Sequence, residues 1–286
     1  MRGGNVVGTE RIVVGVDEHE ASDRAVDWVA VRRVVPGSRV ELVTVANGWG
    51  GDGPALDRRL ARAAERLSAA HPRVDIATFR LAGAPDRMLA DAASTADLLV
   101  IGNRRQHRVR TALDGWMPER VPTLANGPTV IVPEDWRPTH GDVVLGVDDA
   151  NGDTALRFAG AQAVREHRRL SLVRAWNVAD LARVTTVSIL DDPELVEARA
   201  REILNDAERL LHTRFPGLQH RPVVEEGDPA DVLRRYAENA SIVVLGRHHT
   251  SMLGGRFFGS AAHELITRSP TPVCIAPLRS PDPSRA

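Results

Sequence analysis

The sequence predicts an α/β protein of two repeated, doubly wound domains. Each would be a five-stranded parallel sheet in the order 3-2-1-4-5 with helices on both faces. Three observations predict this fold: the chain is internally duplicated, each half holds five short apolar runs, and stretches of helical periodicity separate these runs. Strands that alternate with helices are typical of βαβ units and a parallel sheet. The near-continuous valine and isoleucine runs indicate strands covered on both faces.

The duplication is visible in two pairs of segments. The run RIVVGVDEHEASDRAVDWVA has a second copy, DVVLGVDDANGDTALRFAGA, and GAPDRMLADAASTADLLVIGNRR matches GDPADVLRRYAENASIVVLGRHH. The second copy is longer by a stretch around TTVSILDDPELVEA. We therefore expect domains at residues 10–134 and 141–278, joined by the linker EDWRPTHG, with mobile termini at 1–9 and 279–286.

The expected elements follow in chain order. The strands of the first half are RIVVGV, RVELVTV, VDIATFRL, LLVIG and TVIVP, and those of the second are DVVLGV, RLSLVRAW, HRPVVEE, IVVLG and PVCIAP. A helix is expected over residues 21–34, where Ala25, Trp28, Val29 and Arg32 recur at helical spacing. Residues 57–70 and 194–215 repeat the pattern, with many charged pairs four positions apart.

Composition excludes several function classes. The 286 residues are 43% hydrophobic with a net charge of −1, so packed cores are expected and no global basic field for nucleic acid. All 37 basic residues are arginine, which excludes a Walker or Schiff-base lysine. The only cysteine, Cys274, cannot form an intrachain disulfide and is expected to be buried and inert. No run reaches transmembrane length and no signal-peptide core is seen, so we expect a cytoplasmic protein without a membrane partner.

A ligand is expected where the strand order reverses, between the first and fourth strands of each half. Two loops meet there: GVD after the first strand and a glycine-bounded loop after the fourth. In the second half that loop lies within LGRHHTSMLGGRFFGS. Gly246 and Gly259 would let the backbone approach a phosphate or adopt positive φ. Ser260 is expected to be the N-cap of the following helix, and Arg247 and Arg256 would add positive charge.

These features resemble the universal stress protein family in its tandem form. The resemblance rests on GVD, the long first helix, the small-residue run after the second strand and the loop G-x2-G-x9-G-(S/T), and it spans residues 11–277. It implies ATP or a related adenine nucleotide, possibly with Mg, and a regulatory role in stress response or growth adaptation. On the adenine side it implies Gly15, Val16, Asp17, Val45, Gly146, Val147, Asp148 and Ala175. On the phosphate and ribose side the candidates are Gly102, Gly115, Gly246, Arg247, His249, Gly259, Ser260 and Ala261.

Two bland interpretations compete with these roles: the glycines serve turns, and Asp17 and Asp148 cap the first helix of each half. The chain also departs from the family pattern. His249 stands at the second loop glycine, Arg105 stands there in the first half, and Trp116 replaces the serine or threonine at the helix start. We therefore expect the second half to bind nucleotide better than the first.

Other functions find less support. No metal-ligand set accompanies the pair His248-His249. The arginine cluster at residues 104–110 is expected to be a solvated loop. The HxGH and SGGxDS motifs of related adenine-binding enzymes are missing, so no catalysis beyond slow ATP hydrolysis is expected. A stress-response interaction module with degraded pockets stays open. The fifth strands would be exposed sheet edges unless paired, so we expect the halves to pack through them and two chains to form a homodimer.

Overall fold

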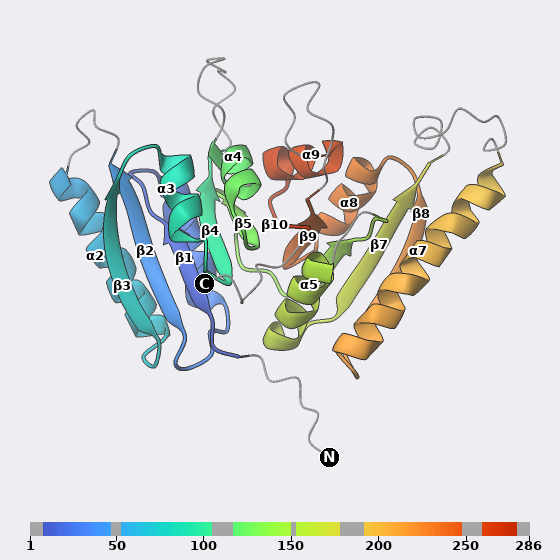
Figure 1. Cartoon of the computed structure of the whole chain (residues 1–286), viewed down its shortest axis with the longest axis horizontal. Helices are drawn as coiled ribbons and strands as arrows, with labels where there is room; N and C mark the ends of the chain where they lie inside the picture. The colour runs from blue at the N-terminus through green and yellow to red at the C-terminus, as the bar shows by residue number, and fades with distance from the viewer. Residues whose placement is uncertain are drawn as a thin grey trace.

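The computed structural model describes residues 8–46, 53–104, 117–149, 153–177, 192–247 and 259–278. Ten strands form a single sheet in the order β3-β2-β1-β4-β5-β10-β9-β6-β7-β8 (Figure 1). The first five strands therefore follow the order 3-2-1-4-5, and the second five repeat this order from the opposite edge. The doubly wound fold expected from the sequence is confirmed.

The first half contains β1 (Arg11–Gly15), α1 (Glu20–Val31), β2 (Arg39–Ala46), α2 (Gly53–Ala70), β3 (Asp75–Ala82), α3 (Pro85–Ala92), β4 (Leu98–Asn103), α4 (Met117–Leu124) and β5 (Thr129–Pro133). The second half contains β6 (Val143–Gly146), α5 (Asp153–Glu166), β7 (Leu170–Trp176), α7 (Pro193–Arg214), β8 (His220–Glu226), α8 (Pro229–Ala237), β9 (Ile242–Gly246), α9 (Ser260–Arg268) and β10 (Val273–Ala276).

Helix boundaries differ from the expected ones where tertiary contacts intervene. The expected helix over 21–34 ends at Val31, because Arg32 has an extended backbone with ψ of 143° and forms the C-cap. The long helix α7 begins as its sequence indicates. Asp192 caps it by accepting a hydrogen bond from the backbone of Glu194, and Pro193 occupies the first helical position.

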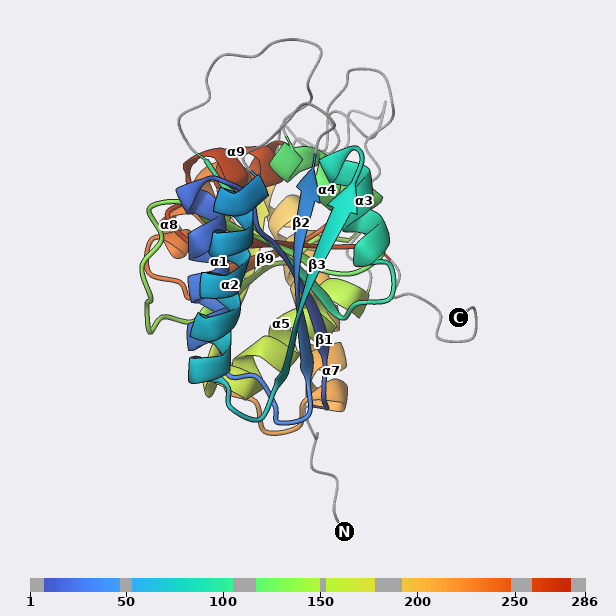
Figure 2. The ribbon, with the colours of Figure 1, turned by 90° about the vertical axis from the view of Figure 1, so that its left-hand side faces the viewer.

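Helices cover both faces of the sheet. Most buried apolar residues of α1, α2, α5 and α7 belong to one cluster, and most of those of α3, α4, α8 and α9 belong to a second. Val196 and Ala200 of α7 pack with Trp176 in a third. Figure 2 shows α1 and α2 on one side of β2 and β3, with α3 on the other. Each central strand is therefore buried on both sides, which explains its uninterrupted apolar sequence.

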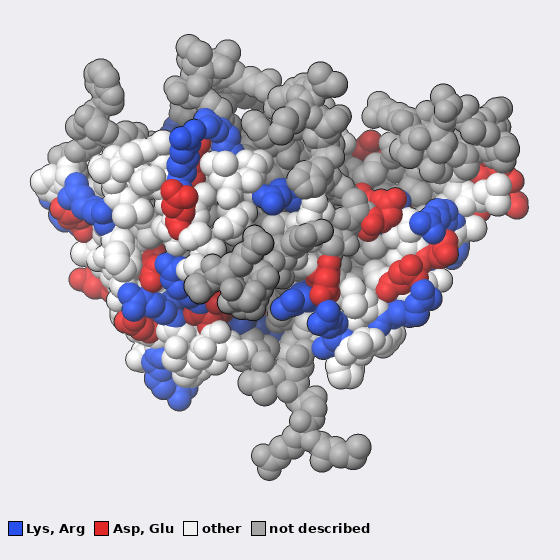
Figure 3. Space-filling view, in the orientation of Figure 1, with Lys and Arg blue, Asp and Glu red and all other residues white. Residues whose placement is uncertain are grey.

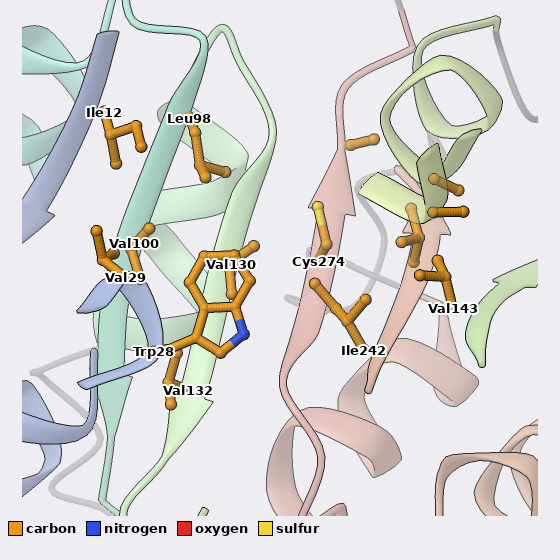
Figure 4. Close-up of a cluster of buried hydrophobic side chains, with 14 of the residues drawn as sticks. Ile12, Trp28, Val29, Leu98, Val100, Val130, Val132, Val143, Ile242 and Cys274 are labelled. Carbon is orange, nitrogen blue, oxygen red and sulfur yellow. The ribbon is translucent and has the colours of Figure 1, made fainter. Parts of the chain in front are cut away.

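The two halves meet along their fifth strands. β10 pairs antiparallel with β5, and Cys274 lies opposite Val130. Figure 4 shows buried side chains of β4 and β5 next to those of β9 and β10, and the same buried cluster includes Trp28 and Ile242 from the two halves. Cys274 is fully buried, as expected, and burial raises the pKa of its thiol well above the usual range.

A buried ion cluster adds to this contact between the halves. Arg32 holds the carboxylate of Glu10 with two guanidinium nitrogens. From the second half, Arg165 places Nη1 3.0 Å from Glu10 Oε2, and Gln162 Oε1 accepts a hydrogen bond from Arg32 Nε at 3.1 Å. Burial, together with the neighbouring charge of Arg32, lowers the pKa of Arg165 to about 10. We refer to Glu10, Arg32, Gln162 and Arg165 as the ion cluster.

The charged surface is mixed in sign. On the face drawn in Figure 3, basic and acidic side chains alternate along α7, where several pairs lie three or four residues apart. Among the described residues, no helix is long and apolar enough to cross a membrane.

Candidate functional site

The strand order reverses at one pair of strands in each half. β1 lies between β2 and β4, and β6 lies between β7 and β9, so the loops after β1 and β4 leave the sheet together, as do those after β6 and β9. All these pairs are parallel, and their carboxyl ends therefore share one edge of the sheet. This edge is where ligands bind in doubly wound folds.

In the second half, the loop after β6 is fixed by neighbouring strand β7. The backbone of Val147 donates to Val173 O at 2.8 Å. Arg174 donates from Nη1 to Val147 O at 3.2 Å, and the same nitrogen lies 3.6 Å from Asp148 Oδ1. Beside it, Ala175 is buried, with 9% exposure. The candidates Val147, Asp148 and Ala175 thus lie together at the carboxyl edge.

Arg174 itself was missed by the sequence reasoning. Its signal was available, because the repeat aligns Arg174 with Thr44 of the first half. A buried polar position that changes to arginine in one copy indicates a new partner, here the loop that carries Asp148.

The first half holds its equivalent loop differently. Asp17 Oδ1 accepts a hydrogen bond from the backbone of His19 at 2.9 Å, and Ser22 Oγ donates to Asp17 O at 3.2 Å. His19, not Asp17, is the N-cap residue of α1. Asp17 therefore closes the turn before the helix, which corrects the cap interpretation. Val16 bonds to β2 as Val147 does to β7, and Val45 is half-buried at the end of β2.

Packing requires glycine at Gly102 and leaves little room for a side chain at Gly146 and Gly15. A Cβ on Gly102 would lie 2.1 Å from Ala21 O, because the start of α1 crosses β4 there. A Cβ on Gly146 would lie 2.7 Å from a methyl carbon of Leu245, and one on Gly15 would lie 3.3 Å from Ile101. Backbone crowding alone explains glycine at Gly102, whereas at Gly146 and Gly15 a neighbouring side chain would have to shift to admit a Cβ.

Gly259 is different. It has an ordinary φ of −59° and forms the N-cap of α9, and a Cβ there would meet no atom of the described residues within 4 Å. Within the described chain, positive φ occurs at other glycines: Gly37, Gly83, Gly217 and Gly227. The positive φ proposed for Gly246 and Gly259 is thus not adopted. Neither its backbone conformation nor crowding by the described part of the chain requires glycine at position 259.

Ser260 is the first residue of α9, not its N-cap as expected, because Gly259 already has the non-helical backbone. The Ser260 side chain is exposed, and Ala261 is partly buried. In the described residues no side chain caps this helix. The amides of its first turn lack partners within the helix, and the helix dipole adds positive potential there, so this end suits an anion.

Arg247 has a role different from the expected phosphate contact. Its backbone bonds to Ala276 O at 2.8 Å, and its Nη1 reaches the first half. There it donates to the carbonyls of Pro122, Thr123 and Ala125. Burial lowers the pKa of this guanidinium. The guanidinium of Arg247 therefore binds the carbonyl groups at the carboxyl end of α4.

Several candidates lie outside the described residues. The expectation that the second half binds nucleotide better than the first therefore rests on the sequences of the two loops. These candidates are Gly115 and His249, together with the departures at Arg105 and Trp116 and the charge at Arg256. Of the remaining candidates, Gly246 ends β9 beside the end of β6. Over the part of the chain that is described, no group of three or more metal-ligating side chains is found.

Both halves match one family model, described as the universal stress protein family, over residues 8–133 and 141–277. A universal stress protein of Mycobacterium tuberculosis is 27% identical over 310 residues, covering 93% of this chain and 94% of that protein. One of Mycolicibacterium smegmatis is 27% identical, covering 92% and 96%. The crystal structure of a universal stress protein from Archaeoglobus fulgidus aligns with a TM-score of 0.68 at 18% identity, covering 94% of this chain and 98% of that one. At this identity, the last comparison supports the fold alone.

Proposed function

The chain belongs to the universal stress protein family, whose model covers both halves, and we propose that it binds an adenine nucleotide such as ATP. The second half is the stronger site, and the bound protein has a regulatory role in stress response or growth adaptation. One observation carries the proposal: Gly259 lies at the start of α9, where no described side chain caps the helix, and neither its φ nor crowding by described residues requires glycine there. A phosphate that approaches the backbone closely would require it.

The proposal divides the site between two groups of residues. The amino end of α9, with Gly259, Ser260 and Ala261, would hold the phosphates. The carboxyl ends of β6 and β7, with Val147 and Asp148, would hold the base. Mg would enter with the phosphates of ATP and needs few ligands from the protein.

The first half is the weaker site in this proposal. By sequence, a tryptophan replaces the small hydroxyl residue at the start of α4, and arginine replaces a loop glycine. We propose that the chain has no enzymatic activity beyond slow ATP hydrolysis. We also propose a cytoplasmic location, because a chain whose one cysteine cannot form an intrachain disulfide suits a reducing compartment.

We also propose that the β5–β10 pairing holds the two halves together in solution and that two chains form a homodimer. The antiparallel register and the apolar cluster shared by both halves support the first statement. The second follows from the sheet edges, since β3 and β8 end the ten-stranded sheet and an edge strand can pair with another chain. Light scattering at several concentrations decides the second.

The test is isothermal titration of ATP into the wild-type chain, Gly259→Asp and the matched first-half variant Gly115→Asp. Gly259→Asp suits this test, because the added Cβ meets no atom of the described residues within 4 Å and aspartate is a favoured N-cap residue. Its carboxylate would take the place of the phosphate. We expect a tenfold or greater loss of affinity, about 1.4 kcal/mol or more, with an unchanged or raised Tm. Gly115→Asp should leave the tight site intact.

Undiminished ATP binding by Gly259→Asp would contradict the proposed site. The alternative is an interaction module with degraded pockets, which the departures at His249, Arg105 and Trp116 favour. It predicts no ATP binding by any variant and no nucleotide released from protein purified without added ligand.

A further inference from the structure

The first half reaches into the second through the residue that ends β4. Asn103 is buried, with 1% exposure, and its Nδ2 donates to the carbonyl of Ile266 at 2.6 Å. Ile266 lies in the last turn of α9. The bond therefore joins the strand that precedes one glycine-bounded loop to the helix that follows the other.

The second half makes the equivalent contact in return. Arg247 lies 144 residues after Asn103, and Pro122 lies 144 residues before Ile266. The guanidinium of Arg247 donates to the carbonyls of Pro122 at 3.1 Å, Thr123 at 2.8 Å and Ala125 at 3.4 Å. These acceptors lie at the carboxyl end of α4, where a cation is also favoured by the helix dipole.

The two contacts close a ring across the domain boundary. We call Asn103, α9, Arg247 and α4 the interdomain ring. α4 and α9 contact each other and lie side by side along one edge of the molecule (Figure 1). In each half, the strand end before the glycine-bounded loop and the helix after it are both bonded to the other half. Neither pair of flanking elements can shift without disturbing the other.

The ring also touches the proposed phosphate position. Ser260 and Ile266 belong to the same nine-residue helix, so these two residues are about 9 Å apart along the axis of one rigid element. A phosphate that draws in or orders the start of α9 therefore acts on the bond to Asn103 at its end. Arg247 directly follows β9 and bonds to the carboxyl end of α4, so a shift at the end of β9 also acts on α4.

We propose that the two nucleotide sites are coupled through the interdomain ring, so that binding in the second half orders α4 and strengthens binding in the first. This inference rests on the proposed function. A ligand that rigidifies a shared frame lowers the entropy cost of the next ligand, which gives positive coupling. Coupling of binding is reciprocal, so a ligand in the first half tightens the second by the same factor.

Hydrogen exchange with mass spectrometry tests the coupling in the full chain. In Gly115→Asp, whose first site is disabled, saturating ATP should raise the protection of α4 amides about fivefold or more, together with that of α9. The double variant Gly115→Asp/Arg247→Met is measured at an ATP concentration that saturates it. In this variant, ATP should no longer raise the protection of the α4 amides. Arg268→Met is the matched control, because this exposed arginine pairs with Glu264 on the same helix; it should keep the response.

The outcomes separate the two proposals. Protection of α9 without any change in α4, or a response in α4 that survives Arg247→Met, overturns the coupling and leaves the proposed function standing. If the titration with ATP gives no heat of binding and ATP does not raise the hydrogen-exchange protection of α9, the proposed function is overturned, and the coupling with it. If Arg247→Met does not fold, the response of α4 in Gly115→Asp alone decides.

Discussion

Replacing Glu10 with glutamine should destabilise the whole protein. In the ion cluster, Glu10 is the acceptor shared by Arg32 and Arg165, whose side chains are 2% and 9% exposed. Glu10→Gln keeps the shape of the side chain but leaves two buried cations beside each other. Arg165 already has a pKa lowered to about 10 by burial and by Arg32, so the site has little capacity for further positive charge.

The expected cost is about 3–5 kcal/mol, the usual range when one partner of a buried ion pair is removed. This is a large share of a typical unfolding free energy of about 5–15 kcal/mol. Urea unfolding followed by circular dichroism and by tryptophan fluorescence measures it, and coincident curves test for a single transition. Because the cluster joins the two halves, curves that separate in Glu10→Gln would show that the halves unfold in turn.

Two variants sharpen this measurement. Glu197→Gln removes an exposed carboxylate that pairs with Arg201 on the same helix, and it should cost less than about 1 kcal/mol. Adding Arg165→Met to Glu10→Gln removes one of the two uncompensated charges, so part of the lost stability should return. A cost for Glu10→Gln no larger than that of Glu197→Gln would refute the reasoning.

Three further predictions concern single residues. Gly102→Ala should lower the unfolding free energy by more than about 1 kcal/mol in urea unfolding, because its Cβ would lie 2.1 Å from Ala21 O; an unchanged midpoint would contradict the packing role. The hydrogen bond from Arg11 holds the pKa of Glu41 below its usual 4.5, so Glu41 stabilises the fold above that pH and loses this contribution as pH falls through its folded pKa. The stability difference between wild type and Glu41→Gln should therefore shrink in acid unfolding series, and a constant difference would be contrary evidence. Cys274 should react with a thiol reagent only as fast as the protein unfolds, and rapid labelling of native protein would show that the core between β5 and β10 opens.

The sequence was sufficient for the topology because the relevant signals are local or repeated. The two GVD copies, the five apolar runs in each half and the alternating helical stretches predict the elements and a doubly wound parallel sheet without knowledge of any contact, and 3-2-1-4-5 is a common strand order for such a sheet. The helix ends were less predictable. Arg32 continues the helical pattern of α1, yet it leaves the helix to bind Glu10 and Gln162, and this preference depends on the partner half.

The candidate site was predictable in position but not in detail. The carboxyl edge and the residues Val147, Asp148 and Gly259 followed from topology and resemblance. The reason for Gly102 did not, because crowding by α1 is a tertiary fact. Arg247 looked like a phosphate ligand because it adjoins the glycine-bounded loop, whereas its acceptors lie more than 120 residues away along the chain. No local pattern carries that information.

The central claim is that the chain has one strong nucleotide site and that it lies at the start of α9. Native mass spectrometry of the wild-type chain during titration with ATP tests it most directly. We predict a single bound ATP per chain over the first part of the titration, and its loss in Gly259→Asp but not in Gly115→Asp. Two sites that fill together, or a first ATP that survives Gly259→Asp, would contradict the claim.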